Sequence, residues 1–99
     1  MIADVRERTG AAAEEVDALV ARRDALAEGE PGLPELEAKI ETAISRWLRA
    51  MEALGLEVKG LWLVDFDNGS GYYGWRWPEE RLEYFHGYDE GYDARTRIQ

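Results

Sequence analysis

The chain has 99 residues, enough for one small domain that buries about 60–65% of the surface its unfolded form exposes. Its 21 acidic and 12 basic residues give a net charge of −9, which argues against a nucleic acid or an anionic membrane surface as its partner. The absence of cysteine excludes disulfides and thiolate metal sites. No apolar run approaches the ~18 residues of a membrane-spanning helix, and the first residues lack a signal-peptide pattern, so we expect a cytoplasmic protein.

The composition of the chain changes near residue 60. The first part is rich in Ala, Glu, Leu and Arg and has a single aromatic residue, Trp47, whereas all the other aromatic residues follow residue 60. This predicts helices first, then strands and turns. The second part is too short to form an independent domain. We therefore expect one domain over residues 1–99, in which a helical hairpin, about 2–55, and a small sheet with its tail, about 57–99, share a core.

Two stretches of the first part have apolar and small residues at spacings of three and four, as on one face of a helix. They predict a helix over about residues 2–28 and a bulkier, more buried helix over about 34–54. The linker EGEPGLP separates them, because its glycines and prolines end one helix and Pro34 suits the first turn of the next. Gly55 is placed to end the second helix in the left-handed conformation, with Leu56 packed back on its last turn.

The aromatic second part predicts a small antiparallel sheet. Apolar, β-branched and aromatic residues favour a strand over 58–66, and an Asn-Gly pair in the turn 67–71 is a strong hairpin signal. The run YYGWRW favours a return strand over 72–77, which a following proline ends. A third strand is expected over 82–86.

The predicted fold class is α+β, with an N-terminal antiparallel helical hairpin packed on a C-terminal three-stranded antiparallel meander. The tail, residues 87–99, is polar and contains glycine, so it is expected to be irregular. Trp47 lies in the middle of the apolar stripe of the bulkier helix, and Trp75 lies on the return strand. We expect both tryptophans in the core shared by the helices and the sheet.

Four motifs of the second half carry a family resemblance. They are LGLEVKG at 54–60, LVDF at 63–66, WRWPEERLEYFH at 75–86 and DEGYDARTRI at 89–98. From Ala53 to Ile98 the chain resembles the uncharacterised domain-of-unknown-function 2203 family of bacteria, although Phe85 stands where tryptophan is usual. The resemblance implies a fold and a polar patch, but no activity. On this chain the last family motif falls on Phe85, His86, Asp89, Glu90, Gly91, Tyr92 and Arg95.

His86 is the only histidine, and it ends the third predicted strand, where binding sites are often built. Asp89 and Glu90 follow closely, and a histidine with carboxylates offers the ligand types for a divalent metal. We expect His86, Asp89 and Arg95 to be close together and hydrogen-bonded around the loop 87–91. The spacing matches no specific metal motif. The interpretation favoured here is a histidine that packs on a tyrosine and hydrogen-bonds within the fold; a ligand-binding or metal-binding histidine is the alternative.

Asp65 lies among apolar residues in the first predicted strand, so it either faces outward or is a buried acceptor. A buried carboxylate needs a partner, and Arg76 or Arg95 is expected to supply it in a structural pair. The turn glutamates that follow Pro78, Glu79 among them, resemble a catalytic carboxylate cluster. They are interpreted as solvated charges, because no sequence feature provides the pocket that such a cluster needs.

Two classes of function remain open. The first is a non-enzymatic interaction or structural domain that forms a homodimer through the helical hairpin. A helix of 25 residues is roughly 37 Å long, more than a small sheet can cover, and a four-helix bundle in a two-fold dimer would bury the rest. The second is a binding or catalytic site for a small ligand or a divalent metal, built around His86, Asp89, Glu90 and Arg95. No cofactor is implied beyond that metal.

Overall fold

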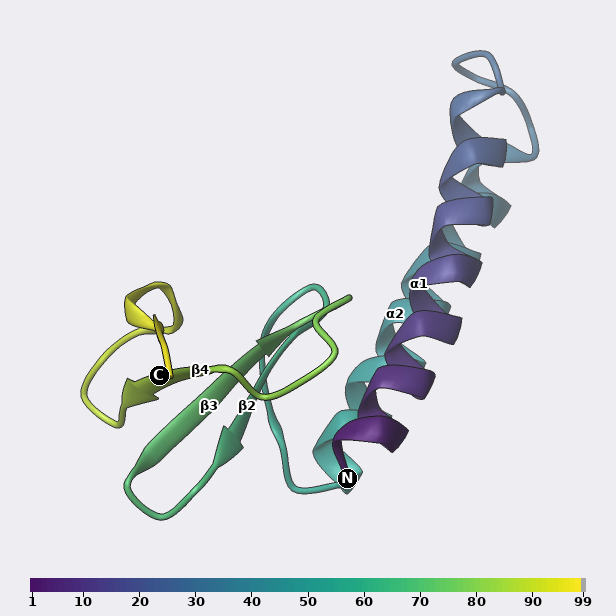
Figure 1. Cartoon of the computed structure of the whole chain (residues 1–99). Coiled ribbons are helices and arrows are strands. Elements are labelled where there is room, and N and C mark those ends of the chain that lie inside the picture. The colour runs from purple at the N-terminus through teal and green to yellow at the C-terminus, as the bar shows by residue number, and fades with distance from the viewer. Residues whose placement is uncertain (99) are drawn as a thin grey trace.

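The protein folds as two helices followed by an antiparallel sheet, described here for residues 1–98 of a computed structural model (Figure 1). The α+β class and the order of a helical hairpin and then a sheet are therefore confirmed. Gln99, the end of the predicted tail, lies outside the described residues. The elements are α1 (Ile2–Asp24), α2 (Leu33–Ala53), β1 (Glu57–Gly60), β2 (Leu63–Asp67), β3 (Gly71–Arg76), β4 (Tyr84–Gly87), the 3-10 helix η1 (Tyr92–Ala94) and β5 (Thr96–Arg97).

Both helices form where the apolar spacing predicts them, although α1 ends four residues earlier, at Asp24. The end of α2 is the one expected: Gly55 has a φ of +79°. The amide of Leu56 donates to the Met51 carbonyl at 3.1 Å, and the amide of Gly55 donates to the Glu52 carbonyl at 2.9 Å. These bonds satisfy carbonyls that the last helical turn leaves free and turn the chain toward β1.

The sheet has five strands in the order β1-β2-β3-β4-β5, so the prediction of three strands is wrong. The predicted strand over 58–66 is in fact a hairpin, because the chain reverses between Gly60 and Leu63. Trp62 in this turn has a φ of 64°, which a residue with a side chain rarely adopts. Its ring meets the Trp47 ring edge-on, with 4.8 Å between centroids. This contact with the helices accompanies the reversal, and no local sequence pattern reports it.

The tail is also more regular than predicted. Strand β5 pairs with β4, and the Ile98 amide donates to the Glu83 carbonyl at 2.7 Å. The prediction of an irregular tail is therefore wrong over Thr96–Arg97, because β4 offers a free edge whose backbone groups the tail can satisfy.

The apolar core has two parts. The sheet-proximal cluster joins one face of the sheet to the ends of both helices, and the distal cluster lies between the helices, with Trp62 packed against it. Trp47 and Trp75 are both in the sheet-proximal cluster, as predicted, with 4% and 0% of their surface exposed. The sheet-proximal cluster is Val5, Trp47, Met51, Leu56, Val64, Phe66 and Trp75. The distal cluster is Val16, Leu19, Leu36, Ile40 and Ala43.

The molecule is elongated, with extents of 50 × 23 × 22 Å. Figure 1 shows why: the hairpin slants away from the sheet, and the turn between α1 and α2 lies at its far end. The sheet lies beside the start of α1 and the end of α2. Neither helix in the described part of the chain combines the length and the apolar character needed to cross a membrane.

Candidate functional site

The candidate site lies on the outer face of the sheet, which faces away from the helices. Side chains alternate between the two faces of a strand, and residues paired across antiparallel strands share a face. Val64 pairs with Trp75 and belongs to the core face. The next pair along the strands, Asp65 and Gly74, therefore lies on the outer face, and so does His86, which pairs with Tyr72.

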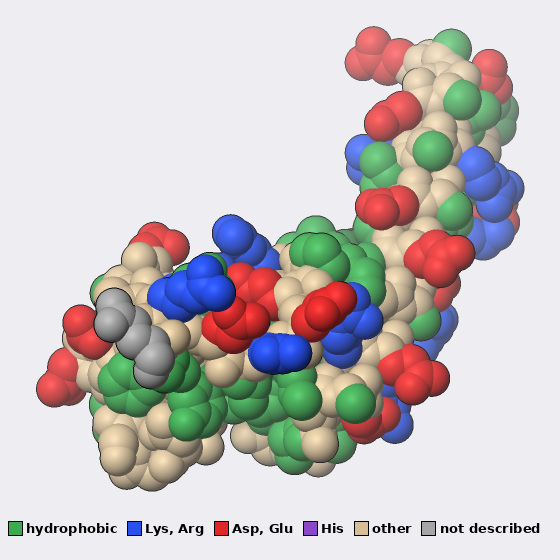
Figure 2. All heavy atoms as spheres, viewed as in Figure 1, with side chains coloured by type: hydrophobic (Ala, Val, Ile, Leu, Met, Phe, Trp, Pro, Cys, Tyr) green, Lys and Arg blue, Asp and Glu red, His purple; other side chains and the backbone are tan. Residues whose placement is uncertain are grey.

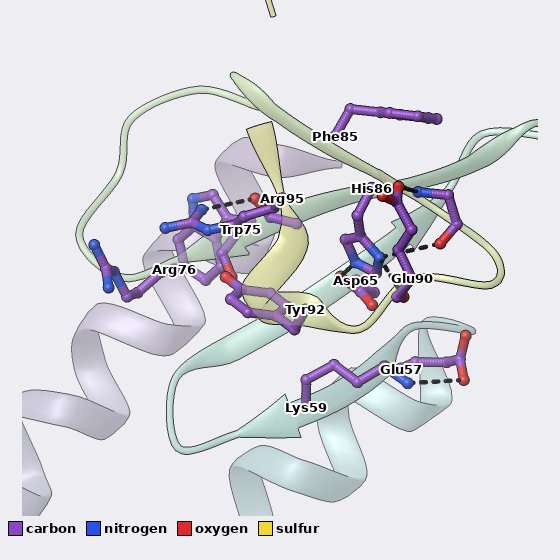
Figure 3. A network of polar contacts seen from close by, with 12 residues as sticks. Glu57, Lys59, Asp65, Trp75, Arg76, Phe85, His86, Glu90, Tyr92 and Arg95 are labelled. Atoms are coloured by element: carbon purple, nitrogen blue, oxygen red, sulfur yellow. Dashed lines mark hydrogen bonds and ion pairs between the residues drawn. The ribbon is translucent and has the colours of Figure 1, made fainter. Parts of the chain in front are cut away.

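Asp65 and His86 form a buried pair at the centre of this face (Figure 3). His86 Nε2 lies 2.8 Å from Asp65 Oδ1, and the two side chains are 2% and 0% exposed. On the other side of the ring, Nδ1 lies 3.1 Å from the Glu90 carbonyl oxygen and 3.3 Å from that of Gly87. The second carboxylate oxygen of Asp65, Oδ2, is buried and has no hydrogen-bond partner in the described part of the chain.

Burial and pairing change the proton affinity of both groups. Burial raises the pKa of Asp65 above its ordinary value, and the opposing effects of His86 and Lys59 do not cancel it. Burial alone would lower the pKa of His86, but the Asp65 carboxylate and the Glu90 and Gly87 carbonyls outweigh it, so the pKa of His86 is raised. Both shifts favour the retention of protons by the folded protein.

The C-terminal segment, defined here as residues 88–98, lies over the buried pair. The Glu90 carboxylate accepts a hydrogen bond from the Gly87 amide at 2.7 Å, and this bond closes the turn after β4. The Tyr92 hydroxyl donates to the Trp75 carbonyl at 2.7 Å, and the Tyr92 ring meets the His86 ring at 5.9 Å between centroids. Burial raises the pKa of Tyr92 to about 12, so its hydroxyl keeps the proton that it donates.

Arg95 fastens the same segment beside the buried pair. Its guanidinium binds both carboxylate oxygens of Glu79, at 2.9 and 3.0 Å, and donates to the Gly74 carbonyl at 3.0 Å. It also lies over the Tyr84 ring, 4.2 Å from its centroid. The two parallel bonds and the ring contact fix the guanidinium in one orientation. Glu79 is thus a partner of Arg95, and its interpretation as a solvated charge is wrong.

Gly74 makes room for this packing. A Cβ atom on Gly74 would lie 3.1 Å from Arg95 Cδ, 3.2 Å from Tyr92 Cε2 and 3.4 Å from His86 Cδ2. The candidate site chosen from the sequence did not include Gly74, Glu79 or Tyr92. A glycine between two aromatic residues inside a strand marks a close approach, and this signal could have indicated Gly74. Nothing in the sequence pattern pairs Glu79 with a residue so far along the chain.

The other site residues predicted from the sequence make contacts that differ from those expected. Asp65 is a buried acceptor as expected, but its partner is His86, so the prediction of Arg76 or Arg95 is wrong. Arg76 is exposed, and Figure 3 shows its side chain pointing away from His86. Asp89 is exposed, and in the described part of the chain its side chain makes no hydrogen bond with His86 or Arg95, so the prediction that these three residues are hydrogen-bonded together is wrong. Within residues 1–98 no group of three or more His, Asp or Glu side chains is arranged to hold a metal ion.

The arrangement as a whole can hold a proton but offers few free groups to a solute. Both ring nitrogens of His86, the Glu90 carboxylate and the Arg95 guanidinium already have partners within the chain. Asp65 Oδ2 has no partner among residues 1–98, and it is buried. The chemistry of the site is therefore that of an internal polar network in which proton transfer between Asp65 and His86 is geometrically open.

The sequence model of an uncharacterized conserved protein family, DUF2203, matches residues 1–98, which include both helices as well as the sheet. The chain belongs to this family. The expected relationship is therefore confirmed, and it extends beyond the half in which the motifs indicated it. No curated protein and no solved structure matches the chain. The family description assigns no activity, so the function has to be argued from the geometry.

Proposed function

We propose that the protein is a non-enzymatic interaction domain that acts in the cytoplasm as a homodimer joined through its helical hairpin. The observation that carries this proposal is the projection of the hairpin beyond the sheet (Figure 1). The distal cluster lies between the two helices, with Trp62 from the turn between β1 and β2 packed against it, and Val20, Leu26 and Ile44 at its edge are half-buried. A second hairpin would complete the enclosure as a four-helix bundle.

One face of the hairpin has a surface suited to a second helix pair. Two shallow hollows run along it between α1 and α2 and share Glu15 and Arg46. Nearly half of the residues that line the groove have small side chains, which let a neighbouring backbone approach closely. We call this surface the alanine groove. Its small residues are Ala11, Ala12, Ala38, Thr42, Ala43 and Ala50.

The charges along the alanine groove favour a second copy as the occupant. Arg8 lines the end near the sheet, and Glu35 lines the far end. A two-fold axis across the middle of the groove would bring each Arg8 against Glu35 of the other copy, and two-fold pairs are the commonest symmetry of small oligomers. Figure 2 shows acidic and basic side chains side by side on the projecting hairpin, so two copies need not repel each other despite the net charge.

The geometry at His86 favours this proposal over the alternative of a small-ligand or metal site. A site that binds a solute presents polar groups that converge on an accessible space. Around His86 the polar groups converge on one another, and the C-terminal segment covers them. We therefore assign His86, Asp65, Glu90 and Arg95 a structural role in the proposed interaction domain.

Light scattering at micromolar concentration tests the proposal. We expect twice the chain mass of 11.3 kDa. Ala11→Glu should return the mass to that of one chain, because it places a charge in the alanine groove. Ala21→Glu is the matched control: Ala21 is also exposed on α1 but lies on a different face of the helix and does not line the groove, so this variant should stay dimeric. A monomeric parent contradicts the dimer, and equal effects of both variants contradict the place of the interface.

A further inference from the structure

The number of protons that the buried Asp65–His86 pair needs can be counted from its contacts. The two atoms facing His86 Nδ1 are carbonyl oxygens, which only accept hydrogen bonds. Nδ1 must therefore carry a hydrogen. The atom facing Nε2 at 2.8 Å is a carboxylate oxygen, so this short contact also needs a hydrogen, on Nε2 or on Asp65 Oδ1. Two protons are required in all.

A histidine and an aspartate with ordinary pKa values hold only one such proton between them at neutral pH. A neutral imidazole has a single N–H, and an ionised carboxylate has none. With the second proton the pair has a net charge of zero, either as imidazolium and carboxylate or as imidazole and carboxylic acid. Without it the pair has a net charge of −1 at a site where both side chains are at most 2% exposed. A buried uncompensated charge is strongly unfavourable, so the fold favours the extra proton.

The charged groups around the pair do not neutralise it in place of this proton. Lys59 on β1 is the cation that acts on Asp65, but Glu57 on the same strand acts in the opposite direction and also lies 3.7 Å from Lys59. Tyr72 on β3 is hydrogen-bonded to Glu57, which raises the pKa of Tyr72 to about 12 and keeps its ring neutral.

The charged side chains next to the pair on the C-terminal segment and on β3 either have other partners or point away from it. The Arg95 guanidinium is neutralised by Glu79, the Glu90 carboxylate is bound to the Gly87 amide, and Arg76 points away from the ring. Tyr92 packs on the His86 ring as a neutral phenol. No cation in the described part of the chain makes an ion pair with Asp65 other than His86 itself.

We infer that Asp65 and His86 form a buried proton-binding site, and that the proton it holds fastens the C-terminal segment onto the sheet. When the proton leaves, the ring keeps one N–H, which goes to the carboxylate because a charge-assisted bond is the stronger one. Nδ1 then faces the Gly87 and Glu90 carbonyls with a lone pair. The turn over 87–90 loses its attachment to the ring, and the segment that follows is released from the outer face. This inference does not depend on the proposed dimer.

Because His86 is the only histidine, its ring signals in a nitrogen-15 NMR spectrum are unambiguous, and the parent protein alone can test the site. We expect two protonated ring nitrogens at pH 7, or one protonated nitrogen together with a protonated Asp65 carboxyl group seen by carbon-13. Either result means that the extra proton is present. A neutral ring beside an ionised Asp65 at pH 7 overturns the inference.

The substitution Asp65→Asn tests the link to the C-terminal segment. The Asn amide can donate to Nε2 of a neutral ring that keeps its hydrogen on Nδ1, so the site is satisfied without an extra proton. In the parent, amide hydrogen exchange at Gly87 and Glu90 should accelerate with pH by more than the rise in hydroxide explains. In Asp65→Asn it should follow hydroxide alone.

Asp89→Asn is the matched control, because it removes the same charge from an exposed position in the same turn. It should retain the parent's steep dependence on pH. A steep dependence that persists in Asp65→Asn, or that is absent from the parent, contradicts the coupling. If Asp65→Asn does not fold, the ring and carboxyl spectra of the parent still decide whether the proton is there.

Discussion

The far half of the hairpin and the outer face of the sheet are built on opposite principles. The distal cluster consists only of apolar side chains held between two helices, and its ion pairs lie on the surface, such as Arg46 with Glu15 at 3.4 Å. The outer face of the sheet buries the Asp65–His86 pair under a short peptide segment, whose Arg95 pairs with Glu79. The hairpin can exchange one apolar residue for another of similar size, whereas each polar group of the outer face depends on a particular partner.

The two regions obtain their specificity from different sources. Helix contacts repeat along the chain, so the apolar spacing of α2 alone indicates which residues face α1. The contacts of the outer face depend on the register of β2, β3 and β4, since a slip by one residue would move Asp65 and His86 to the core face. Substitutions can test this contrast, beginning with a tryptophan in the core between the helices and the sheet.

Trp75 should give the largest loss of stability, because it is fully buried in the sheet-proximal cluster and its indole N–H donates to the Glu79 carbonyl at 2.8 Å. Trp75→Ala should cost about 3–5 kcal/mol. In a domain of this size that lowers the melting temperature by more than about 12 °C. Thermal unfolding followed by circular dichroism measures it. A variant that melts within a few degrees of the parent would mean that helices and sheet do not share this core.

Breaking the buried pair should come next. Asp65→Ala leaves the His86 ring with an unpaired nitrogen in a buried site, and His86→Ala leaves a buried carboxylate, so each should cost about 3 kcal/mol. The double variant should cost less than the sum of the two, because both substitutions remove the same contact. Urea denaturation of the three variants gives the coupling energy. Additive losses would show that the two side chains act independently, against the 2.8 Å contact.

The sequence was informative about this pair only in part. It indicated that Asp65 needs a partner, because a carboxylate among apolar residues cannot be buried alone. It placed His86 at a strand end, but the partner was assigned to an arginine. The choice between them depends on strand register, and the predicted sheet lacked the turn at Trp62 and the pairing of β5. Those two features come from contacts with Trp47 and with β4, which are distant in sequence and have no local signature.

Gly74→Ala should test the fit of the segment over the sheet. The added methyl group would press on Arg95, Tyr92 and His86 at 3.1–3.4 Å, so we expect a loss of about 1–3 kcal/mol. Gly91→Ala is the control in the same region. Gly91 has a φ of −73° and open space where a Cβ would lie, so this variant should be neutral or slightly stabilising. Equal losses at both positions would show that neither reports on packing around His86.

The stability of the protein should fall as the pH rises. The folded-state pKa values of Asp65 and His86 both lie above their ordinary values of 3.8 and 6.5. For each group, the folded chain therefore binds more protons than the unfolded chain at pH values between its ordinary pKa and its folded-state pKa. The contribution of His86 is complete below its unfolded pKa and is lost as the pH rises through its folded pKa. Urea midpoints across this range measure the trend. A rise in stability from pH 6 to pH 9 would contradict the assigned shifts.

The smallest expected effect shows whether burial, or position in the sheet region, determines the cost of losing an ion pair. Arg97 and Glu83 form an ion pair at 3.1 Å in the sheet region, but their side chains are 70% and 40% exposed. If the sheet region as a whole depends on its polar contacts, Arg97→Ala should be as harmful as a break in the buried pair. If burial decides, Arg97→Ala should cost about 0.2–1 kcal/mol, and 1 M salt should remove most of the effect, as for an exposed pair on the hairpin. We expect the second result, because water solvates both charges whether or not they meet. Urea midpoints of parent and variant at low and high salt measure the difference, with Arg46→Ala as the matching change on the hairpin.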